Sequence, residues 1–348
     1  MNIFHLWVKL NMVKKKQSFV LSTTSLTIIK AELSMSSDTN VIVANNFHPP
    51  TLSKMEKKFR LHHLWKLDEA SRKECVDSLS GRCHFAVTAS WSCDEEIYNL
   101  KSLRLISAFG VGVDGINFDR TQARGIRVSN TPDVLNDAVA ELAIGLMVAS
   151  TREIIAADQF ARTNKWLGGP FRLGSSLKGK TLGILGLGSI GQSVAKRITP
   201  FGVSIAYHNR SQFDSHYQYC PTIIELAEVS DVLLCLLPGG ANTNQLVNGA
   251  VFNALGPNGI FINLGRGNSV EENDLINAVT KKKIKLACLD VYENEPHISE
   301  ALRSLENVIL LPHIGSATAE TRAKMGDLVI RNIEAFLENE QLVSEVFA

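Results

Sequence analysis

The sequence has little of what marks a disulfide-rich, zinc-binding or membrane-spanning protein. Its six cysteines are scattered and form no C-x-x-C pair, so neither a disulfide framework nor a structural zinc site is expected. No apolar run approaches the roughly 20 residues that a helix needs to cross a bilayer. The net charge is only +1, which creates no field for a polyanion such as nucleic acid. We therefore expect a reduced, cytoplasmic protein with no metal, nucleic-acid or membrane partner.

The first 37 residues lack arginine and contain one acidic residue, Glu32, although lysine, serine and threonine are plentiful. A transit peptide is acid-poor and serine-rich, but it is usually arginine-rich as well. We interpret residues 1–37 as an N-terminal extension, disordered and untargeted. Organellar targeting, and a true start at Met35, stay open as alternatives.

A length of 348 residues suggests about two domains. From Thr181 onward, short apolar runs alternate with helical patterns, which is typical of a parallel, doubly wound sheet. Residues 130–132 (Asn-Thr-Pro) are expected to open a long helix between the domains, with Thr131 as its cap. The amphipathic stretch 319–337 has no strand of its own to cover, so we expect it to pack back on the first domain.

The most informative stretch is Thr181-Leu-Gly-Ile-Leu-Gly-Leu-Gly-Ser-Ile-Gly, which predicts a strand, a tight turn and a helix start. Gly186, Gly188 and Gly191 form G-x-G-x-x-G. The glycines allow the turn, the approach of a pyrophosphate and the packing of helix on strand. Backbone N–H groups at the helix start, at Ser189 and Ile190, would hold the negative charge. We predict a dinucleotide-binding site here.

The end of the next predicted strand, residues 203–207, lacks an acidic residue. An NAD enzyme usually carries Asp or Glu about 20 residues after the glycines, to bind the ribose 2′-hydroxyl. This chain instead has Asn209, Arg210 and Ser211, and its first acid is Asp214. Arg210 could pair with a 2′-phosphate, and its neighbours could donate hydrogen bonds. We therefore predict a preference for NADPH, with NADH possible.

Polar residues follow three further strands of this half of the chain. Arg266 lies in Asn-Leu-Gly-Arg-Gly, Asp290 and Glu295 lie in Asp-Val-Tyr-Glu-Asn-Glu-Pro, and His313 lies in Pro-His-Ile-Gly. Ends of parallel strands face one crevice, so these side chains are expected to converge. A cation can hold a carboxylate and polarise a carbonyl, and a histidine oriented by a carboxylate can transfer a proton. Hydride transfer to a 2-oxo acid needs such a set.

Two loops of the first half also follow predicted strands. Ala89-Ser90-Trp91 lies after the strand at 85–88, and Gly110-Val111-Gly112-Val113-Asp114 follows the strand at 105–108. We expect the first loop to contact substrate and the second to bring its backbone close to a ligand. Ordinary turn chemistry is an equal alternative for each loop taken alone.

Together these motifs make the sequence resemble the D-isomer-specific 2-hydroxy acid dehydrogenases from about residue 40 to residue 347. The motifs occur in the family's order, from residues 110–114 and 128–132 to residues 311–315. Within the family the chain is similar to plant-type glyoxylate, hydroxypyruvate and hydroxyphenylpyruvate reductases. The implied fold is α/β, with two doubly wound parallel-sheet domains. A Rossmann-type NAD(P)-binding domain (133–317) is inserted in a discontinuous, flavodoxin-like substrate domain (38–132 and 318–348).

The resemblance also implies residue roles. Arg266 would bind the substrate carboxylate and carbonyl, His313 would be the general acid and Glu295 its partner, and Asp290 would contact the nicotinamide. Backbone N–H groups of Val111 and Gly112 would hold the carboxylate.

The resemblance also implies a homodimer, in which Trp166 either reaches the partner's site or serves only in packing. One departure is the loop 237–243, Leu-Pro-Gly-Gly-Ala-Asn-Thr, which we expect to reshape the adenine edge and leave the chemistry unchanged.

The predicted function is NADPH-dependent reduction of hydroxypyruvate or glyoxylate to the D-2-hydroxy acid. Hydroxyphenylpyruvate reduction is the alternative. A nucleotide-sensing co-repressor is a third reading, and the NADP-type loop argues against it.

Overall fold

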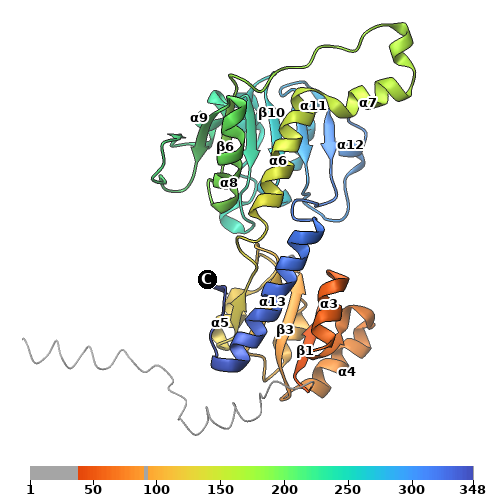
Figure 1. The fold of residues 1–348 in the computed structure, drawn as a ribbon, viewed down its shortest axis with the longest axis vertical. Coiled ribbons are helices and arrows are strands. Elements are labelled where there is room, and N and C mark those ends of the chain that lie inside the picture. The colour runs from red at the N-terminus through yellow and green to blue at the C-terminus, as the bar shows by residue number, and fades with distance from the viewer. Residues whose placement is uncertain (1–37, 90–92, 348) are drawn as a thin grey trace, which may run out of the picture.

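We describe a computed structural model of the chain, covering residues 38–89 and 93–347. It forms two lobes, each built around one sheet flanked by helices (Figure 1). Residues 1–37, Ser90 and Trp91 lie outside the described residues, so the expectations placed on them are not addressed below.

The first lobe contains a six-stranded sheet of order β13-β5-β4-β3-β1-β2. All its neighbouring strands are parallel except β13, which pairs antiparallel to β5. The strands are β1 (Asn40–Val43), β2 (Arg60–His63), β3 (Cys83–Ala89), β4 (Leu105–Phe109), β5 (Arg127–Ser129) and β13 (Glu345–Val346). Every residue of β4 is buried, as expected of a central strand covered on both faces. The order of β1 to β5 is the flavodoxin-like arrangement.

Four helices and two short 3-10 turns accompany this sheet in the described part of the chain. They are α3 (Pro49–Glu56), η1 (Leu64–Lys66), α4 (Glu69–Leu79), η2 (Glu95–Asn99), α5 (Phe118–Ala123) and α13 (Ala319–Asn339). Helix α13 packs against β4 and α3, so the expectation that the last helix returns to the first lobe is confirmed (Figure 1). The sequence pattern missed β2 and β13.

The second lobe contains a parallel seven-stranded sheet of order β12-β11-β10-β9-β6-β7-β8. This order, with the strand before the glycine motif beside the strand before Asn209, is that of a Rossmann domain. The strands are β6 (Thr181–Leu185), β7 (Ser204–His208), β8 (Gln218–Tyr219), β9 (Val232–Cys235), β10 (Ile260–Asn263), β11 (Leu286–Leu289) and β12 (Val308–Leu310).

Helices cover both faces of this sheet, and one pair extends beyond it. They are α6 (Asn136–Thr151), α7 (Ile154–Arg162), η3 (Lys165–Gly168), α8 (Ser189–Ile198), η4 (Thr199–Phe201), α9 (Ile223–Val229), η5 (Ala241–Thr243), α10 (Gly249–Leu255), η6 (Gly267–Ser269), α11 (Glu272–Thr280) and α12 (Glu300–Arg303). Helix α6 packs along α8 and reaches down to the connection between the lobes (Figure 1). Among the described residues, no helix is long and apolar enough to cross a membrane.

The expected start of the long helix at residues 130–132 is wrong. Helix α6 begins six residues after Asn130, at Asn136. Asp133 has a left-handed backbone (φ 64°), and this interrupts the helical path after Pro132. Thr131 is fully buried, and its backbone N–H donates to the carbonyl of Gly110. The residue therefore continues the chain beside β4 and does not cap α6.

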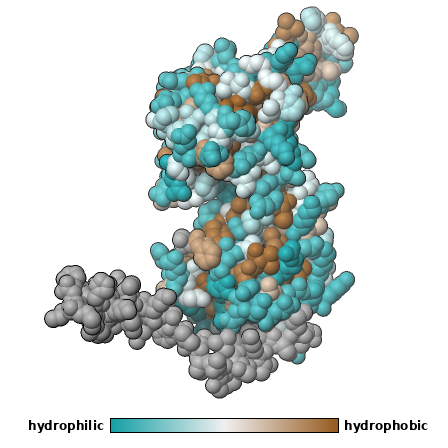
Figure 2. Space-filling view, turned by 60° about the vertical axis from the view of Figure 1, so that its left-hand side comes forward, coloured by the Kyte–Doolittle hydropathy of each residue, from teal (hydrophilic) through white to brown (hydrophobic). Residues whose placement is uncertain are grey.

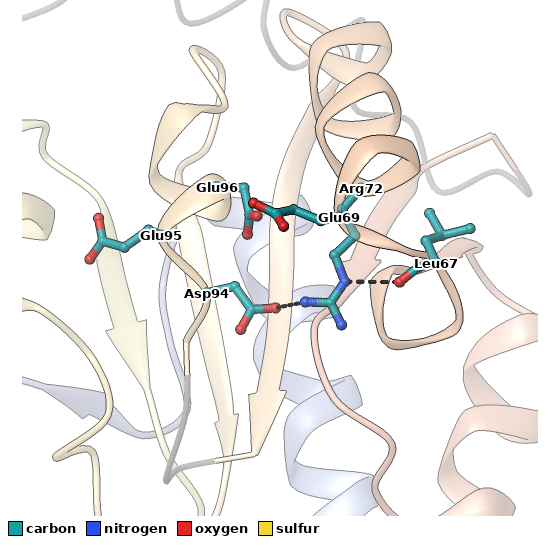
Figure 3. Close-up of a pocket in the computed structure, with 6 residues that line it drawn as sticks. All are labelled: Leu67, Glu69, Arg72, Asp94, Glu95 and Glu96. Atoms are coloured by element: carbon teal, nitrogen blue, oxygen red, sulfur yellow. Dashed lines mark hydrogen bonds and ion pairs between the residues drawn. The ribbon is translucent and has the colours of Figure 1, made fainter.

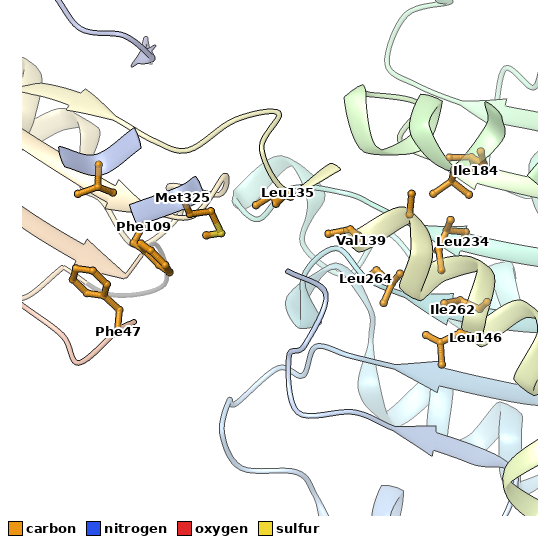
Figure 4. Packing of buried hydrophobic residues seen from close by; sticks show 14 of the residues in the cluster. Phe47, Phe109, Leu135, Val139, Leu146, Ile184, Leu234, Ile262, Leu264 and Met325 are labelled. Carbon is orange, nitrogen blue, oxygen red and sulfur yellow. The ribbon is translucent and has the colours of Figure 1, made fainter. Parts of the chain in front are cut away.

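Apolar packing runs through the connection between the lobes. One cluster of buried residues includes Phe47, Phe109 and Met325 in the first lobe and Ile184 and Ile262 in the second (Figure 4). Residues Leu135 and Val139, at the start of α6, lie between these two groups (Figure 4). The loops on either side of this connection therefore face one another.

Candidate active site

The glycine motif forms the predicted strand–turn–helix unit. Strand β6 ends at Leu185, Gly186 adopts φ +101°, and α8 begins at Ser189. A Cβ on Gly191 would lie 2.8 Å from the carbonyl oxygen of Gly186, so only glycine allows this helix to start so close to the turn. At Gly188, by contrast, nothing lies within 4 Å of a Cβ position, so the space in front of the helix is open. This geometry fits a dinucleotide pyrophosphate.

The residues after β7 are arranged beside this turn. Asn209 uses its side-chain oxygen to accept a hydrogen bond from the Leu187 N–H (2.7 Å), so it braces the glycine loop. Arg210 and Ser211 are exposed. This edge carries a cation, and its first acidic residue along the chain is the exposed Asp214. It therefore suits a phosphorylated ribose better than a free 2′-hydroxyl.

His313 and Glu295 form a direct pair. The Nδ1 atom of His313 lies 2.7 Å from Oε2 of Glu295, and Oε1 of Glu295 accepts the Tyr292 N–H at 3.0 Å. Burial would raise the pKa of Glu295, but the hydrogen bond and charge of His313, the Tyr292 N–H and the charge of Arg266 outweigh it. The pKa of Glu295 is therefore lowered. The carboxylate stays ionised beside the imidazole.

Asp290 is buried and supports the loop that carries His313. Its two carboxylate oxygens accept the N–H groups of Ile314 and Gly315, each at 2.7 Å. Burial raises the pKa of Asp290, although these hydrogen bonds and the charge of His313 oppose the shift. The sequence assigned Asp290 to the nicotinamide. The structure adds an anchoring contact that the sequence did not reveal.

Arg266 follows β10 and reaches the first lobe. Its Nε lies 3.0 and 3.3 Å from the two carboxylate oxygens of Asp114, and its Nη1 donates to the Gly265 carbonyl at 2.9 Å. Its Nη2 lies against Gly112, only 1.7 Å from where a Cβ on that residue would be. The structure thus brings together Arg266 and Gly112, to which the family resemblance gives roles in binding the substrate carboxylate.

A side chain from the segment after β5 holds the loop after β4. The Asn130 side chain donates to the Val111 carbonyl at 2.8 Å. Within the described ranges, no group accepts a hydrogen bond from the N–H of Val111 or Gly112. Ala89, at the end of β3, is buried and donates its N–H to the Asn45 side chain at 2.9 Å.

The loop 237–243, which the sequence places at the adenine edge, also lies against Asp114. A Cβ on Gly239 would lie 2.8 Å from Cγ of Asp114, the partner of Arg266. An open cavity of about 530 Å³ is lined by Asp114 and Gly115 on one side and Gly240, Ala241, Asn244 and Asn268 on the other. The loop 237–243 therefore contacts the first lobe as well as its own lobe.

Trp166 lies away from these residues of its own chain. It belongs to η3, on the arm that α7 and the segment after it extend from the second lobe (Figure 1). The side chain is 71% exposed.

A cavity of about 450 Å³ in the first lobe contains none of the predicted site residues (Figure 3). Arg72 lies at its centre and donates to the carbonyls of Leu64 and Leu67 and to the Asp94 carboxylate. These bonds join α4 to the neighbouring turns, so the arginine has a structural role. Among the described residues, no group of three or more His, Cys, Asp or Glu side chains could hold a metal ion.

A dinucleotide cradle and a histidine–carboxylate pair at the same edge of one parallel sheet define a nucleotide-dependent oxidoreductase. Comparison with known proteins specifies which one. Residues 144–315 match the NAD binding domain of the D-isomer specific 2-hydroxyacid dehydrogenases. The chain belongs to this family, and it is an NAD(P)-dependent 2-hydroxyacid dehydrogenase.

Two plant enzymes and one bacterial structure illustrate the relationship. A glyoxylate/hydroxypyruvate reductase of Arabidopsis thaliana is 41% identical over 84% of this chain and 94% of its own length. A hydroxyphenylpyruvate reductase of Plectranthus scutellarioides is 40% identical over the same shares. An NADPH-dependent glyoxylate/hydroxypyruvate reductase from Sinorhizobium meliloti, solved with NADP and malonate, matches with a TM-score of 0.81. It is 38% identical and covers 89% of this chain and 97% of its own.

Proposed function

We propose that the chain reduces a small 2-oxo acid, hydroxypyruvate or glyoxylate, to the D-2-hydroxy acid, with NADPH as the preferred cofactor. The observation that carries this proposal is the 2.7 Å pair of His313 and Glu295, at the same sheet edge as Arg266. The names of the Arabidopsis and Sinorhizobium relatives support the choice of substrates.

The residues divide the reaction between them. Arg266 binds the substrate carboxylate and polarises the carbonyl, and the N–H groups of Val111 and Gly112 donate hydrogen bonds to the carboxylate oxygens. Bound NADPH, held at the glycine turn, would supply the hydride that the carbonyl carbon accepts. His313 donates a proton from Nε2 to the carbonyl oxygen, because Nδ1 is held by Glu295. Glu295 stabilises the protonated imidazole before that transfer and fixes the orientation of the ring.

Each of the two lobes would bind a different ligand. Residues 133–317 would hold the dinucleotide, through Gly186, Gly188, Ser189, Ile190 and Gly191. Residues 38–132 and 318–348 would hold the substrate, with Ala89 beside it. Closing the domains over the substrate would exclude water from hydride transfer.

The cofactor preference rests on Arg210. An exposed arginine, with no acid before Asp214, favours the 2′-phosphate of NADPH. The NADPH-dependent bacterial relative supports this choice.

A homodimer is also part of the proposal. No residue of α7 is buried, and the arm exposes Ile155, Trp166, Leu167 and Leu173. Figure 2 shows brown, hydrophobic surface on this projecting arm at the top of the molecule. Such a surface suits a second copy of the chain, whose site Trp166 would approach.

Initial rates for hydroxypyruvate, glyoxylate and 4-hydroxyphenylpyruvate, each with NADPH and NADH, test the proposal. We expect the highest kcat/KM for hydroxypyruvate or glyoxylate with NADPH. A preference for hydroxyphenylpyruvate would instead place the chain with its Plectranthus relative, which is almost equally similar. Absence of turnover with all three acids would refute the proposal.

A further inference from the structure

We propose that Asp114 is a positioning residue that fixes the catalytic arginine across the two domains, and that Gly239 makes the space for it. This rests on the proposed role of Arg266 as the ligand of the substrate carboxylate. It assigns a function both to the aspartate of the Gly-Val-Gly-Val-Asp motif and to the altered loop 237–243.

Each nitrogen of the Arg266 guanidinium has its own neighbour. Nε donates to both carboxylate oxygens of Asp114, and Nη1 donates to the Gly265 carbonyl. Together these contacts fix the plane of the guanidinium beside Gly112, where Oδ1 of Asp114 also lies 2.7 Å from the position of a Cβ on that glycine. Nη2 is thereby directed at the backbone of Gly112, where the substrate carboxylate would bind.

The pair joins two separate elements. Asp114 follows β4 of the first sheet and Arg266 follows β10 of the second, 152 positions apart. The two side chains are each 25% exposed, so water screens their attraction only partly. The orientation of Arg266 therefore depends on the domains being correctly placed, which couples substrate binding to domain position.

Gly239 explains why Asp114 can occupy this position. A Cβ at residue 239 would meet Cγ of Asp114 at 2.8 Å and Cβ of Asp114 at 3.0 Å. Any larger residue would push the carboxylate away from its present place. The Gly-Gly loop thus acts on Arg266 through Asp114.

Three variants test the inference: Asp114→Asn, Gly239→Ala and the control Asp327→Asn. Asp327 has a similar ion pair, with Lys54 at 2.7 Å, on the surface of the first lobe. We expect Asp114→Asn to raise the KM of the 2-oxo acid by about tenfold or more, because a charge-assisted contact to the arginine is lost. Gly239→Ala should raise it in the same direction. The Kd for NADPH alone should stay within about twofold in every variant, and the control should match wild type.

A second measurement needs no turnover. The Nε–H resonance of Arg266, identified by its loss in Arg266→Lys, should exchange slowly with solvent in wild type. It should exchange faster in Asp114→Asn and in Gly239→Ala. If the panel of 2-oxo acids shows no turnover, the proposed function fails, while this resonance still decides whether Asp114 holds Arg266. An unchanged KM with an unchanged Nε–H signal in Asp114→Asn would overturn the inference.

Discussion

At the scale of single residues, three carboxylates fix the groups of the candidate site through hydrogen bonds. Glu295 holds His313, Asp290 holds the N–H groups of Ile314 and Gly315, and Asp114 holds Arg266. Each supporting carboxylate lies on a different loop from the group that it orients. Such a shell fixes the geometry of the reacting side chains before substrate arrives.

Replacing His313 by Gln should cut kcat by ~10²–10⁴, the usual contribution of a positioned acid–base group. Glutamine keeps a hydrogen-bonding side chain but cannot transfer the proton. The Kd for NADPH should change little, because His313 lies outside the glycine turn. Single-turnover rates would check this, and a variant that kept more than about half of the wild-type rate of chemistry would contradict the assignment.

Arg210→Ala should reduce the NADPH preference by ~10-fold or more, because at least one charge-assisted contact to the 2′-phosphate is lost. The activity with NADH should be nearly unchanged. The measurement is kcat/KM for both cofactors in wild type and variant. Wild type favouring NADH, or a variant with an intact preference for NADPH, would show that Arg210 is only a surface residue.

The lowered pKa of Glu295 predicts how far the pH can fall before the ion pair of Glu295 with His313 is lost. Because the carboxyl is ionised more readily in the folded protein than in the unfolded chain, its stabilising contribution is complete above the unfolded value. It is lost only as the pH falls through the lower, folded value. ¹³C NMR of the carboxyl, identified by its loss in Glu295→Gln, should give a midpoint below 4.5, the ordinary value. A midpoint at or above that value would disprove the shift.

At the scale of helices and strands, apolar runs predicted the second sheet well. Strands β6 and β11 match their predicted ranges, and every predicted strand of that sheet is present. Buried parallel strands are short, nearly continuous apolar segments, which makes them visible in a sequence. The short polar strand β8 and the edge strand β2 lack that pattern and were missed.

Short sequence motifs gave wrong or incomplete predictions where contacts between distant residues determine the structure. The Asn-Thr-Pro sequence has the composition of a helix start, yet Thr131 is drawn into the sheet edge by Gly110. Likewise, the sequence contains Asp114 and Gly239 in recognisable motifs, but nothing local shows that they touch. The converging set of Arg266, Glu295 and His313 was predictable because parallel strands end at one edge. The contacts of Asp114 with Arg266 and Gly239 were not predictable, because they depend on how the two sheets are placed relative to one another.

Asn332 illustrates a tertiary contact that the sequence hides, and it gives a stability prediction. It is fully buried on α13, accepts the N–H groups of Val343 and Ser344, and donates to the Leu328 carbonyl and the Ser344 hydroxyl. Asn332→Ala would leave the N–H groups of Val343 and Ser344 without their acceptor and would remove the contact of this segment with α13, whereas the Ser344 hydroxyl would keep the Asn130 carbonyl. We expect a loss of about 2–3 kcal/mol in the free energy of unfolding.

Urea unfolding would measure this loss, with Asn253→Ala as the control. Asn253 is exposed on α10, so its replacement should change stability by less than about 0.5 kcal/mol. Equal stabilities of the two variants would mean that Asn332 does not hold the C-terminal segment.

At the scale of the whole molecule, two sheets of different order meet through a narrow connection of apolar residues and a few polar contacts. The Arg266–Asp114 pair crosses between the loops of the two sheets, and α6 supports the connection from the second lobe. The Arg266–Asp114 contact therefore depends on how the two lobes are placed. The arm of α7 takes no part in either lobe's core, which leaves its exposed apolar residues to be explained.

The arm gives the last prediction. Leu167 is 90% exposed and Leu173 is 95% exposed, a cost in water that burial against a second chain would remove. Wild type should therefore sediment at twice the chain mass at micromolar concentration, and the double variant Leu167→Glu/Leu173→Glu should be monomeric, because burying two carboxylates is unfavourable. Val229→Glu, at an exposed apolar residue at the end of α9, is the matched control and should stay dimeric. If Trp166 also completes the partner's site, the monomeric variant should lose kcat/KM for the 2-oxo acid while its Kd for NADPH is retained. A monomeric wild type, or a dimeric double variant, would show that the arm has another purpose.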